Sequence, residues 1–528
     1  MSFLFFLSIF KNSKNNSGSL MKTNLNKDTL ILLFSIIVIA CCGLLYELLI
    51  GTASSYLLGN SVEQFSLTIG AFMVSFGIGS YLTRFVQKNI IVLFFVIETL
   101  IGFFGSISII SLFYFYSVSD VYSFLVYFFI AVIGVMVGFE IPLIGRIIND
   151  IKNNFKLTLS NLFSFDYIGA MIGSVALPLF LLPYFGLIKS SILVGIGNLV
   201  VALLFGIRFR KSFSQKLLLL PIVLIFFNLF LLVGARDIQI YLEQRLYEDK
   251  IVYFEQTKYQ RIVITENKED VRLFLDGNIQ FSSKDEARYH ELLIHIPLAL
   301  AEKKEKLKIL ILGGGDGLAV REMLKYSNIE KITICDLDQR MTELFRDDPK
   351  LTLLNEHSLS SPLVEVFNED AFNFLKNSKR QWDIIIADLP DPNNESLAKL
   401  YSTSFYHYMK KNLEEKGVGV TQSTSPYHAR EAFWCIFDTL KKAGFASVLP
   451  YQAEVPSFGS WGFILFSDKV LAVPQKIEIA DEKLKFLSDE LITSLFIFPK
   501  DTAYVKTKPN TLFEPSILTY YLESWKYY

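Results

Sequence analysis

Cysteine and histidine are scarce in this sequence, which limits the metal and redox chemistry open to it. The 528 residues contain four cysteines and five histidines. The cysteines are Cys41, Cys42, Cys335 and Cys435, and their spacings match no metal-binding pattern. The histidines are equally scattered. We therefore expect reduced thiols, no disulfide framework and no metal site.

A basic patch with interleaved aromatic residues is also missing, which argues against binding to nucleic acid. The 51 Lys and Arg nearly balance the 52 Asp and Glu, for a net charge of −1. Hydrophobic residues, in contrast, make up 52% of the chain, and the mean hydropathy is +0.38. A soluble enzyme of this length is rarely so apolar.

The apolar excess is concentrated before Ala235, in runs long enough to cross a bilayer. A spanning helix needs about 20 apolar residues, and about seven runs meet this criterion. They cover residues 30–50, 65–85, 90–113, 121–143, 165–185, 187–205 and 217–233. The pattern predicts a basic cytoplasmic tail (1–28) and a multi-pass α-helical membrane domain (29–234) in contact with the lipid bilayer.

Lys and Arg between these runs predict an orientation. They precede the first run and follow the second, fourth and sixth, whereas the alternate connections are nearly free of them, with Lys189 as the exception. The positive-inside rule then places the N-terminus in the cytoplasm. An odd number of spans would put the rest of the chain outside, against the cytosolic substrate inferred below. We expect an inner-membrane protein with a cytoplasmic catalytic domain. This requires either that one run is re-entrant or interfacial, or that residues 1–10 form another membrane element. The alternative is a truly odd number of spans.

From Ala235 onward the composition is that of an ordinary, slightly acidic α/β protein. Residues 251–257, 260–266 and 271–275 alternate like strands, and Asp276-Gly277 is a strong hairpin signal. They predict a small antiparallel β subdomain (235–282). Strands and helices alternate from Lys308, which predicts a Rossmann-like, methyltransferase-type doubly wound sheet (283–470). Residues 471–528 are expected to form an amphipathic helical extension without recognisable chemistry.

A glycine-rich turn follows the first strand of the doubly wound domain. Leu310-Ile311-Leu312 runs directly into Gly313-Gly314-Gly315-Asp316-Gly317, and a helical pattern begins at Leu318. This arrangement presents backbone N–H groups to a nucleoside ligand. Asp316, within the turn, repels anionic ligands and favours cationic ones.

Other acids follow the predicted strands, namely Asp336, Asp370, Asp388 and Asp391. Because ligands sit beyond the carboxyl ends of the strands in such sheets, we expect these acids to line one negative cleft suited to a cation. Asp336 follows the glycine turn by about 20 residues, which fits a ribose-hydroxyl ligand. A lone Asp after a strand is usually a helix N-cap, and for Asp370 this alternative is equally good.

Four motifs of the second half occur together in one enzyme family. They are Gly313-Gly314-Gly315-Asp316-Gly317, Tyr289-His290-Glu291, Asp388-x-x-Asp391-Pro392 and the segment from Pro456 to Phe463. Together they resemble the spermidine synthases, or polyamine aminopropyltransferases, over roughly residues 253–467. Cys42 to Leu49 and Gly138 to Leu143 are similar to motifs of the long bacterial form with an N-terminal membrane domain. The chain departs from the soluble enzymes at Leu318, where glycine is usual, and at Asp336, where Glu is common.

The resemblance implies transfer of an aminopropyl group from decarboxylated S-adenosylmethionine to putrescine, giving spermidine and methylthioadenosine. Asp388 would be the general base, because the attacking amine is mostly protonated at neutral pH and must lose a proton. Decarboxylated S-adenosylmethionine is a co-substrate, so no further cofactor or metal is implied. Soluble relatives form dimers or tetramers, so the resemblance implies a homodimer or homotetramer.

The remaining implied site residues fall into two groups. Those expected to bind decarboxylated S-adenosylmethionine or methylthioadenosine are Gln260, Gly313, Gly315, Asp336, Asp370 and Ala371. Those expected to bind the polyamine are Tyr289, His290, Asp316, Asp391 and Tyr451. For the two tyrosines ordinary core packing is an equally good explanation.

Two other functions stay open at this stage. A polyamine transporter or sensor is suggested by Glu47, Glu140 and Asp166, because acids inside apolar runs are costly and often functional. These acids could equally lie near the interfaces or pair within the bundle. An S-adenosylmethionine methyltransferase is the other possibility, and Asp316 argues against it because that compound carries a carboxylate.

Overall fold

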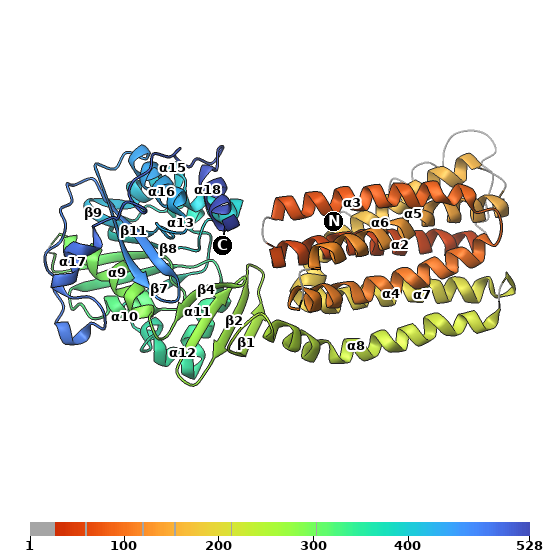
Figure 1. Cartoon of the computed structure of the whole chain (residues 1–528), viewed down its shortest axis with the longest axis horizontal. Helices are drawn as coiled ribbons and strands as arrows, with labels where there is room; N and C mark the ends of the chain where they lie inside the picture. Colours follow the sequence, from red (N-terminus) through yellow and green to blue (C-terminus); the bar gives the residue numbers. More distant parts are fainter. Residues whose placement is uncertain are drawn as a thin grey trace, which may run out of the picture.

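The computed structural model describes residues 27–58, 61–118, 121–152, 155–212, 214–302 and 304–527. The chain forms two bodies, a bundle of long helices and an α/β domain (Figure 1). Helix α8 (Leu219–Gln244) runs along the bundle and leads directly into the first strand of the α/β domain. All but the end of the predicted tail (1–28) lies outside the described residues.

In the described part of the chain the bundle comprises seven long helices, most of whose surface is apolar. They are α2 (Lys27–Leu58), α3 (Ser61–Leu82), α4 (Ile90–Tyr116), α5 (Tyr122–Lys152), α6 (Phe155–Ala176), α7 (Leu182–Arg208) and α8. Among the described residues, six helical segments are long and apolar enough to cross a membrane. One segment, Leu159–Arg208, has 50 residues, roughly 75 Å if straight, which is far longer than one crossing needs.

That long segment is a helical hairpin. A π-helical turn, η2 (Leu177–Leu181), links α6 to α7, and Gly186 has a non-helical backbone with φ of 68°. The Ser190 hydroxyl donates to Leu181 O at 3.0 Å across the reversal. A left-handed φ is open to glycine at little cost, so Gly186 permits the chain to turn back. The segment thus contains two of the predicted apolar runs.

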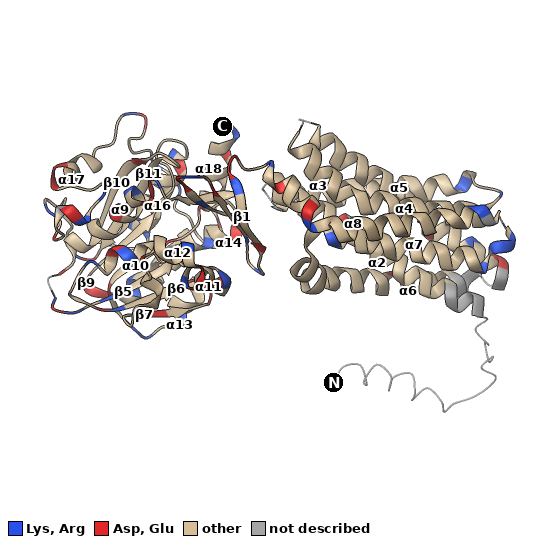
Figure 2. Cartoon of the chain, turned by 90° about the horizontal axis from the view of Figure 1, so that it is seen from below, with Lys and Arg blue, Asp and Glu red and all other residues tan. Residues whose placement is uncertain are grey.

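Basic side chains lie mainly at the end of the bundle farthest from the α/β domain (Figure 2). The connections at that end contain Arg84, Lys88, Arg210, Lys211 and Lys216. The α/β domain and the basic connections therefore lie at opposite ends of the bundle. The structure thus retains the conflict between the positive-inside rule and a cytoplasmic catalytic domain.

Helix α8 is clamped to the α/β domain at its end. Glu243 forms a buried ion pair with Arg261, and the Gln244 side chain accepts from the Ile251 N–H at 2.9 Å and donates to Asp249 O at 2.8 Å. The ion pair is shielded on both sides, with each side chain 5% exposed. The bundle and the α/β domain are thus joined by packed side chains as well as by the chain itself.

The α/β domain contains two sheets. The first is antiparallel, with the order β1 (Lys250–Gln256), β2 (Arg261–Glu266), β3 (Val271–Leu275) and β4 (Asn278–Ser282). A two-residue turn at Asp276 (φ 48°) and Gly277 (φ 82°) joins β3 to β4, as the sequence predicts.

The second sheet has seven strands in the order β10-β11-β9-β8-β5-β6-β7. Five strands pair with one another in parallel: β5 (Leu307–Gly313), β6 (Ile329–Cys335), β7 (Val364–Phe367), β8 (Trp382–Asp388) and β9 (Leu413–Gln422). Strands β10 (Ser447–Val455) and β11 (Gly459–Ser467) add an antiparallel edge. The order reverses between β5 and β8, which is where open α/β sheets bind their ligands. The Rossmann-like expectation is confirmed.

Helices cover both faces of this sheet. They are α9 (Glu286–Leu300), α10 (Leu318–Met323), α11 (Gln339–Asp347), α12 (Pro349–Leu354), α13 (Ala371–Asn377), α14 (Glu395–Ala398), α15 (Thr403–Asn412) and α16 (Arg430–Lys442). The central strands read as continuous apolar runs, such as Ile309 to Leu312 and Ile384 to Ala387, all fully buried. A strand covered on both faces requires such a run.

The C-terminal segment is less helical than the sequence suggests. After β11 its α-helices are only α17 (Asp489–Leu495) and α18 (Ser516–Ser524). The rest runs as irregular chain over the α/β domain and is held by buried polar groups. The Glu291 carboxylate, for example, accepts the N–H groups of Lys485, Phe486 and Leu487 at 2.6–3.0 Å.

Candidate active site

The glycine turn lies between two acids at the carboxyl edge of the sheet. Gly313 and Gly317 have φ values of 86° and 76°, which favour glycine. A Cβ on Gly313 would lie 1.9 Å from Asp388 O, and one on Gly315 would lie 2.6 Å from Asp336 Oδ2. Side chains at these positions would collide with the neighbouring strand ends, so the turn can approach a ligand only as bare backbone.

Asp336, at the end of β6, is held by backbone donors. Its carboxylate accepts from the Gly315 N–H at 3.1 Å and the Asp338 N–H at 2.9 Å. Burial, aided by the neighbouring Asp338 and Asp316, outweighs the two N–H donors and raises its pKa to about 6. Gln260 reaches the same region from the small sheet, donating to Asp338 Oδ2 at 3.1 Å.

Asp370 and Ala371 begin helix α13 after β7. Asp370 caps this helix by accepting the Asn373 N–H at 2.9 Å, and Lys399 binds its other oxygen at 2.7 Å. Burial opposes ionisation, but the Lys399 and Asn373 hydrogen bonds outweigh it and lower the pKa of Asp370. Asp370 is therefore an N-cap paired with a lysine, and its charge is already balanced.

Asp388 ends β8 on the other side of the glycine turn. Its Oδ1 accepts the Tyr289 hydroxyl at 2.5 Å. Burial, aided by the neighbouring Asp316, outweighs His290 and the Tyr289 hydrogen bond and raises the pKa of Asp388 to about 6. Burial likewise raises the pKa of Asp316, which accepts the Leu318 N–H at 2.9 Å. Two carboxyl groups with raised pKa values thus lie close together.

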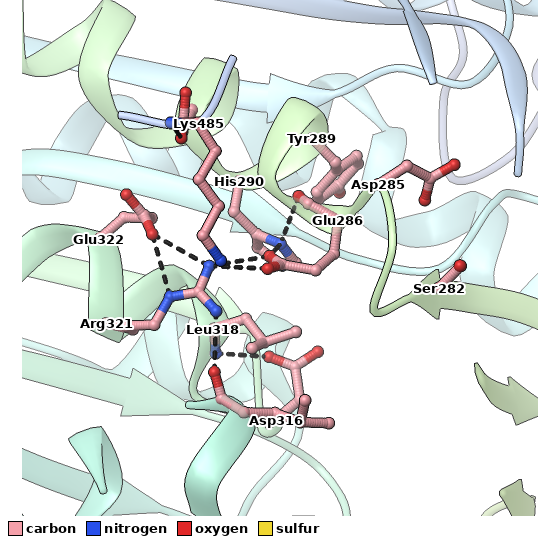
Figure 3. Close-up of polar contacts among 12 residues, drawn as sticks. Ser282, Asp285, Glu286, Tyr289, His290, Asp316, Leu318, Arg321, Glu322 and Lys485 are labelled. Carbon is pink, nitrogen blue, oxygen red and sulfur yellow. Dashed lines mark hydrogen bonds and ion pairs between the residues drawn. The ribbon is translucent and has the colours of Figure 1, made fainter. Parts of the chain in front are cut away.

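His290 supplies the positive charge nearest to these acids. Its Nδ1 lies 2.9 Å from Glu286 Oε2 (Figure 3). Burial lowers the pKa of His290, but Glu286, Asp316 and Asp388 outweigh it and raise the pKa to about 9. Glu286 is bound in turn by Arg321 at 2.9 and 3.0 Å, as Figure 3 shows. The imidazole is therefore cationic at neutral pH, and Glu286 and Arg321 hold it in place.

Asp391 is surrounded by hydroxyl and amide donors. It accepts from Thr424 at 3.1 Å, Gln422 at 3.3 Å and the Tyr521 hydroxyl of α18 at 3.0 Å. Burial still raises the pKa of Asp391 to about 6. These donors hold the carboxylate in place while leaving its charge unbalanced.

The four acids other than Asp370 share one property. In the described part of the chain, no Lys or Arg forms an ion pair with Asp316, Asp336, Asp388 or Asp391. Their negative charge is offset by His290, by neutral hydrogen-bond donors and, for Asp316, by the more weakly acting Arg321. Such a site favours a ligand that brings its own positive charge.

The two candidate tyrosines have different positions. Tyr289 contacts the site through its hydroxyl, and its ring packs edge-on against Phe458, in the Pro456-to-Phe463 motif. Tyr451 is fully buried, its hydroxyl donates to Leu292 O at 2.9 Å, and its ring stacks on Phe463. Tyr451 therefore packs in the core behind the site and does not line it.

Sequence reasoning missed several residues that shape the site. Glu286, Asp338, Gln422, Thr424 and Tyr521 each contact a predicted site residue, and Arg321 binds Glu286. Glu286 carried a local signal, because it lies four residues before His290 on the same helix. Tyr521 carried none, because it is 130 residues away from Asp391.

Comparison with known proteins agrees with this geometry. Residues 286–476 match the Spermine/spermidine synthase domain family. A polyamine aminopropyltransferase of Leptospira interrogans is 41% identical over 94% of this chain and 98% of its own length. Polyamine aminopropyltransferase 2 of Ralstonia nicotianae is 38% identical over 95% of this chain and 99% of its own length.

The first of these relatives matches across both bodies of the molecule, since so little of either chain is left uncovered. Among solved structures, a spermidine synthase in complex with the transition-state analogue AdoDATO aligns with 47% of this chain and 85% of its own, with 28% identity and a TM-score of 0.43. The identity and coverage of the curated relatives establish that the chain belongs to the polyamine aminopropyltransferase family, enzymes of the spermidine synthase type.

Proposed function

We propose that the α/β domain transfers an aminopropyl group from decarboxylated S-adenosylmethionine to putrescine, with Asp388 as the general base. The observation that carries this proposal is the state of Asp388. It lies beside the glycine turn, no lysine or arginine of the described chain balances its charge, and its pKa is raised to about 6. A base with a pKa near the working pH is suited to accept a proton and to release it after the reaction.

The nucleoside would bind along the glycine turn. Asp336 is the acid expected to hold the ribose hydroxyls, since backbone N–H groups already orient its carboxylate. Gln260 approaches the same place through Asp338. Asp370 and Ala371 would border the base from the start of α13, where the N-cap geometry fixes both residues.

Asp316 would select the decarboxylated compound. Decarboxylated S-adenosylmethionine carries an ammonium and a sulfonium and lacks the carboxylate of S-adenosylmethionine. The partly buried Asp316 carboxylate attracts the ammonium and repels a carboxylate in the same position. Asp391 would hold an ammonium of the polyamine. His290, which is itself cationic, would act on the polyamine through the Asp316 and Asp388 carboxylates.

The chemical step is a displacement at the carbon next to sulfur. One putrescine ammonium gives its proton to Asp388, and the freed lone pair forms the new C–N bond. The C–S bond breaks, its electron pair stays on sulfur, and methylthioadenosine leaves as a neutral thioether. Holding both reactants in this geometry supplies much of the acceleration.

A product assay with the purified full chain tests the reaction. With decarboxylated S-adenosylmethionine and putrescine we expect spermidine and methylthioadenosine in equal amounts; folded protein that forms neither would contradict the proposal. Asp388→Asn should lower kcat by about 10²-fold or more while methylthioadenosine binding is kept. Asp347→Asn is the matched control, because Asp347 is exposed and pairs with Arg346.

We further propose that the helical bundle is embedded in the inner membrane and that the α/β domain faces the cytoplasm. The apolar helices support the first part, and a cytosolic co-substrate supports the second. The basic connections at the far end of the bundle favour the opposite face. Assembly into a homodimer or homotetramer stays a prediction, which light scattering of the solubilised protein would test.

Labelling of single cysteines determines the side. Val470 is 90% exposed on the α/β domain, and Lys211 is exposed in a connection at the far end of the bundle. If the α/β domain is cytoplasmic, an impermeant maleimide should label Lys211→Cys in intact cells and Val470→Cys only after permeabilisation. The reverse pattern would place the enzyme site outside.

A further inference from the structure

The helical bundle contains a pair of buried acids that the active site does not use. Glu98 of α4 is fully buried, and Glu140 of α5 is 3% exposed. Their carboxyl groups lie within hydrogen-bonding reach of each other. Asn198 of α7 donates its amide to Glu98 Oε2 at 3.0 Å. Three helices therefore bring one polar cluster into the apolar interior of the bundle.

The hydrogen bonding of this cluster is incomplete without a proton. Glu98 Oε1 and Glu140 Oε1 are both buried and have no donor among the described residues. An ionised carboxylate only accepts hydrogen bonds, so two carboxylates cannot bond to each other. One proton turns one acid into a donor, satisfies the pair and leaves Asn198 to stabilise the remaining charge.

The groups that face the pair supply no alternative cation. They are Cys42 and Tyr46 of α2 and Asp166 of α6, in addition to Asn198. None of them carries a positive charge, and Asp166 adds a negative one. The described His, Cys, Asp and Glu side chains also form no group of three that could hold a metal ion.

We propose that Glu98 and Glu140 form a proton-binding site in the helical bundle, with Asn198 stabilising the ionised partner. Acids inside apolar helices mark proton relays and ion pathways in membrane proteins. Uptake and release of one proton at this pair changes the charge of the bundle interior by one unit. Proton binding at this pair is separate from aminopropyl transfer, because none of its residues belongs to the active site.

Infrared spectroscopy of the full chain in lipid nanodiscs tests this site, because the C=O stretch of a protonated carboxyl lies apart from the amide bands. We expect a protonated-carboxyl signal in the parent protein at pH 8, where the active-site acids with pKa values of about 6 are ionised. Glu98→Gln and Glu140→Gln should each remove it, whereas Glu63→Gln, which changes an exposed acid at the start of α3, should retain it. Aminopropyl transfer by each variant, unchanged from the parent, shows that the chain is folded.

Three results would overturn the assignment. One is the absence of a protonated-carboxyl signal in the parent protein, and another is its persistence in both glutamine variants. The third is a carboxylate signal at the pair that shifts with sodium or with propylamine, which would make another cation the occupant. If either glutamine variant fails to fold, Asn198→Ala keeps both acids, and its signal must shift in frequency because Glu98 loses its donor.

Discussion

The Tyr289 hydroxyl offers a direct test of Asp388 as the base. Tyr289→Phe removes the hydroxyl that donates to Asp388 Oδ1 and keeps the buried ring. A hydrogen bond to a charged group contributes about 1.5–3 kcal/mol, and one pKa unit corresponds to about 1.36 kcal/mol. Because this bond stabilises the ionised form, its loss should raise the pKa of Asp388 from about 6 to between about 7 and 8.

The predicted effect on rate follows from the fraction of Asp388 that is ionised. At pH 7 this fraction falls from about nine-tenths to between about one-half and one-tenth. The value of kcat/KM should therefore drop about twofold to tenfold at pH 7 and approach that of the parent enzyme near pH 9. The measurement is methylthioadenosine formation between pH 5 and 9, below the range where His290, with its pKa of about 9, loses most of its charge.

Tyr451→Phe is the matched control. This tyrosine is also buried, but its hydroxyl donates to Leu292 O in the core. We expect the fall of its kcat/KM at low pH to occur at the same pH as in the parent enzyme. If kcat/KM of Tyr289→Phe also falls near pH 6, in a protein with normal substrate binding, the assignment of Asp388 as the titrating base is refuted.

Three further substitutions test the other parts of the site. Asp316→Asn removes the charge that excludes a carboxylate, so inhibition by S-adenosylmethionine should strengthen about tenfold, measured as its inhibition constant. Gly315→Ala places a Cβ 2.6 Å from Asp336 Oδ2, so KM for the nucleoside co-substrate should rise about tenfold or more with little change in KM for putrescine. Tyr521→Phe removes the 3.0 Å hydrogen bond to Asp391 and should raise KM for putrescine at pH 7, with recovery at pH 9. A nucleoside KM that changes as much as the putrescine KM would contradict the role of Asp391.

The sequence could predict the site where topology alone brings residues together. Asp336 and Asp388 follow parallel strands, and such strands end at one edge whatever the rest of the chain does. Their separation by the glycine turn, seen at Gly313 and Gly315, follows from the same rule. Asp370 shows the limit of this rule. Its position after a strand predicted that it lies near the other acids, but only the structure reveals that Lys399 forms an ion pair with its carboxylate.

Other parts could not be predicted because they depend on contacts between distant segments. Tyr521 reaches Asp391 from a C-terminal segment whose composition suggested only an amphipathic helix. The pairing of Glu98 with Glu140 needs the register of α4 against α5, which hydropathy does not give. Hydropathy did predict the apolar runs on both sides of Gly186, because each run is a continuous stretch of apolar residues in the sequence.

Helix α8 has a mechanical consequence. A flexible tether would let the catalytic domain tumble, but α8 is continuous and its last turn is fastened to the small sheet through Glu243, Gln244 and Arg261. Such a rod transmits torque and displacement with little loss. Any tilt of the bundle must therefore turn the whole catalytic domain with it. The distance between the catalytic domain and the last apolar turn of α8 stays constant.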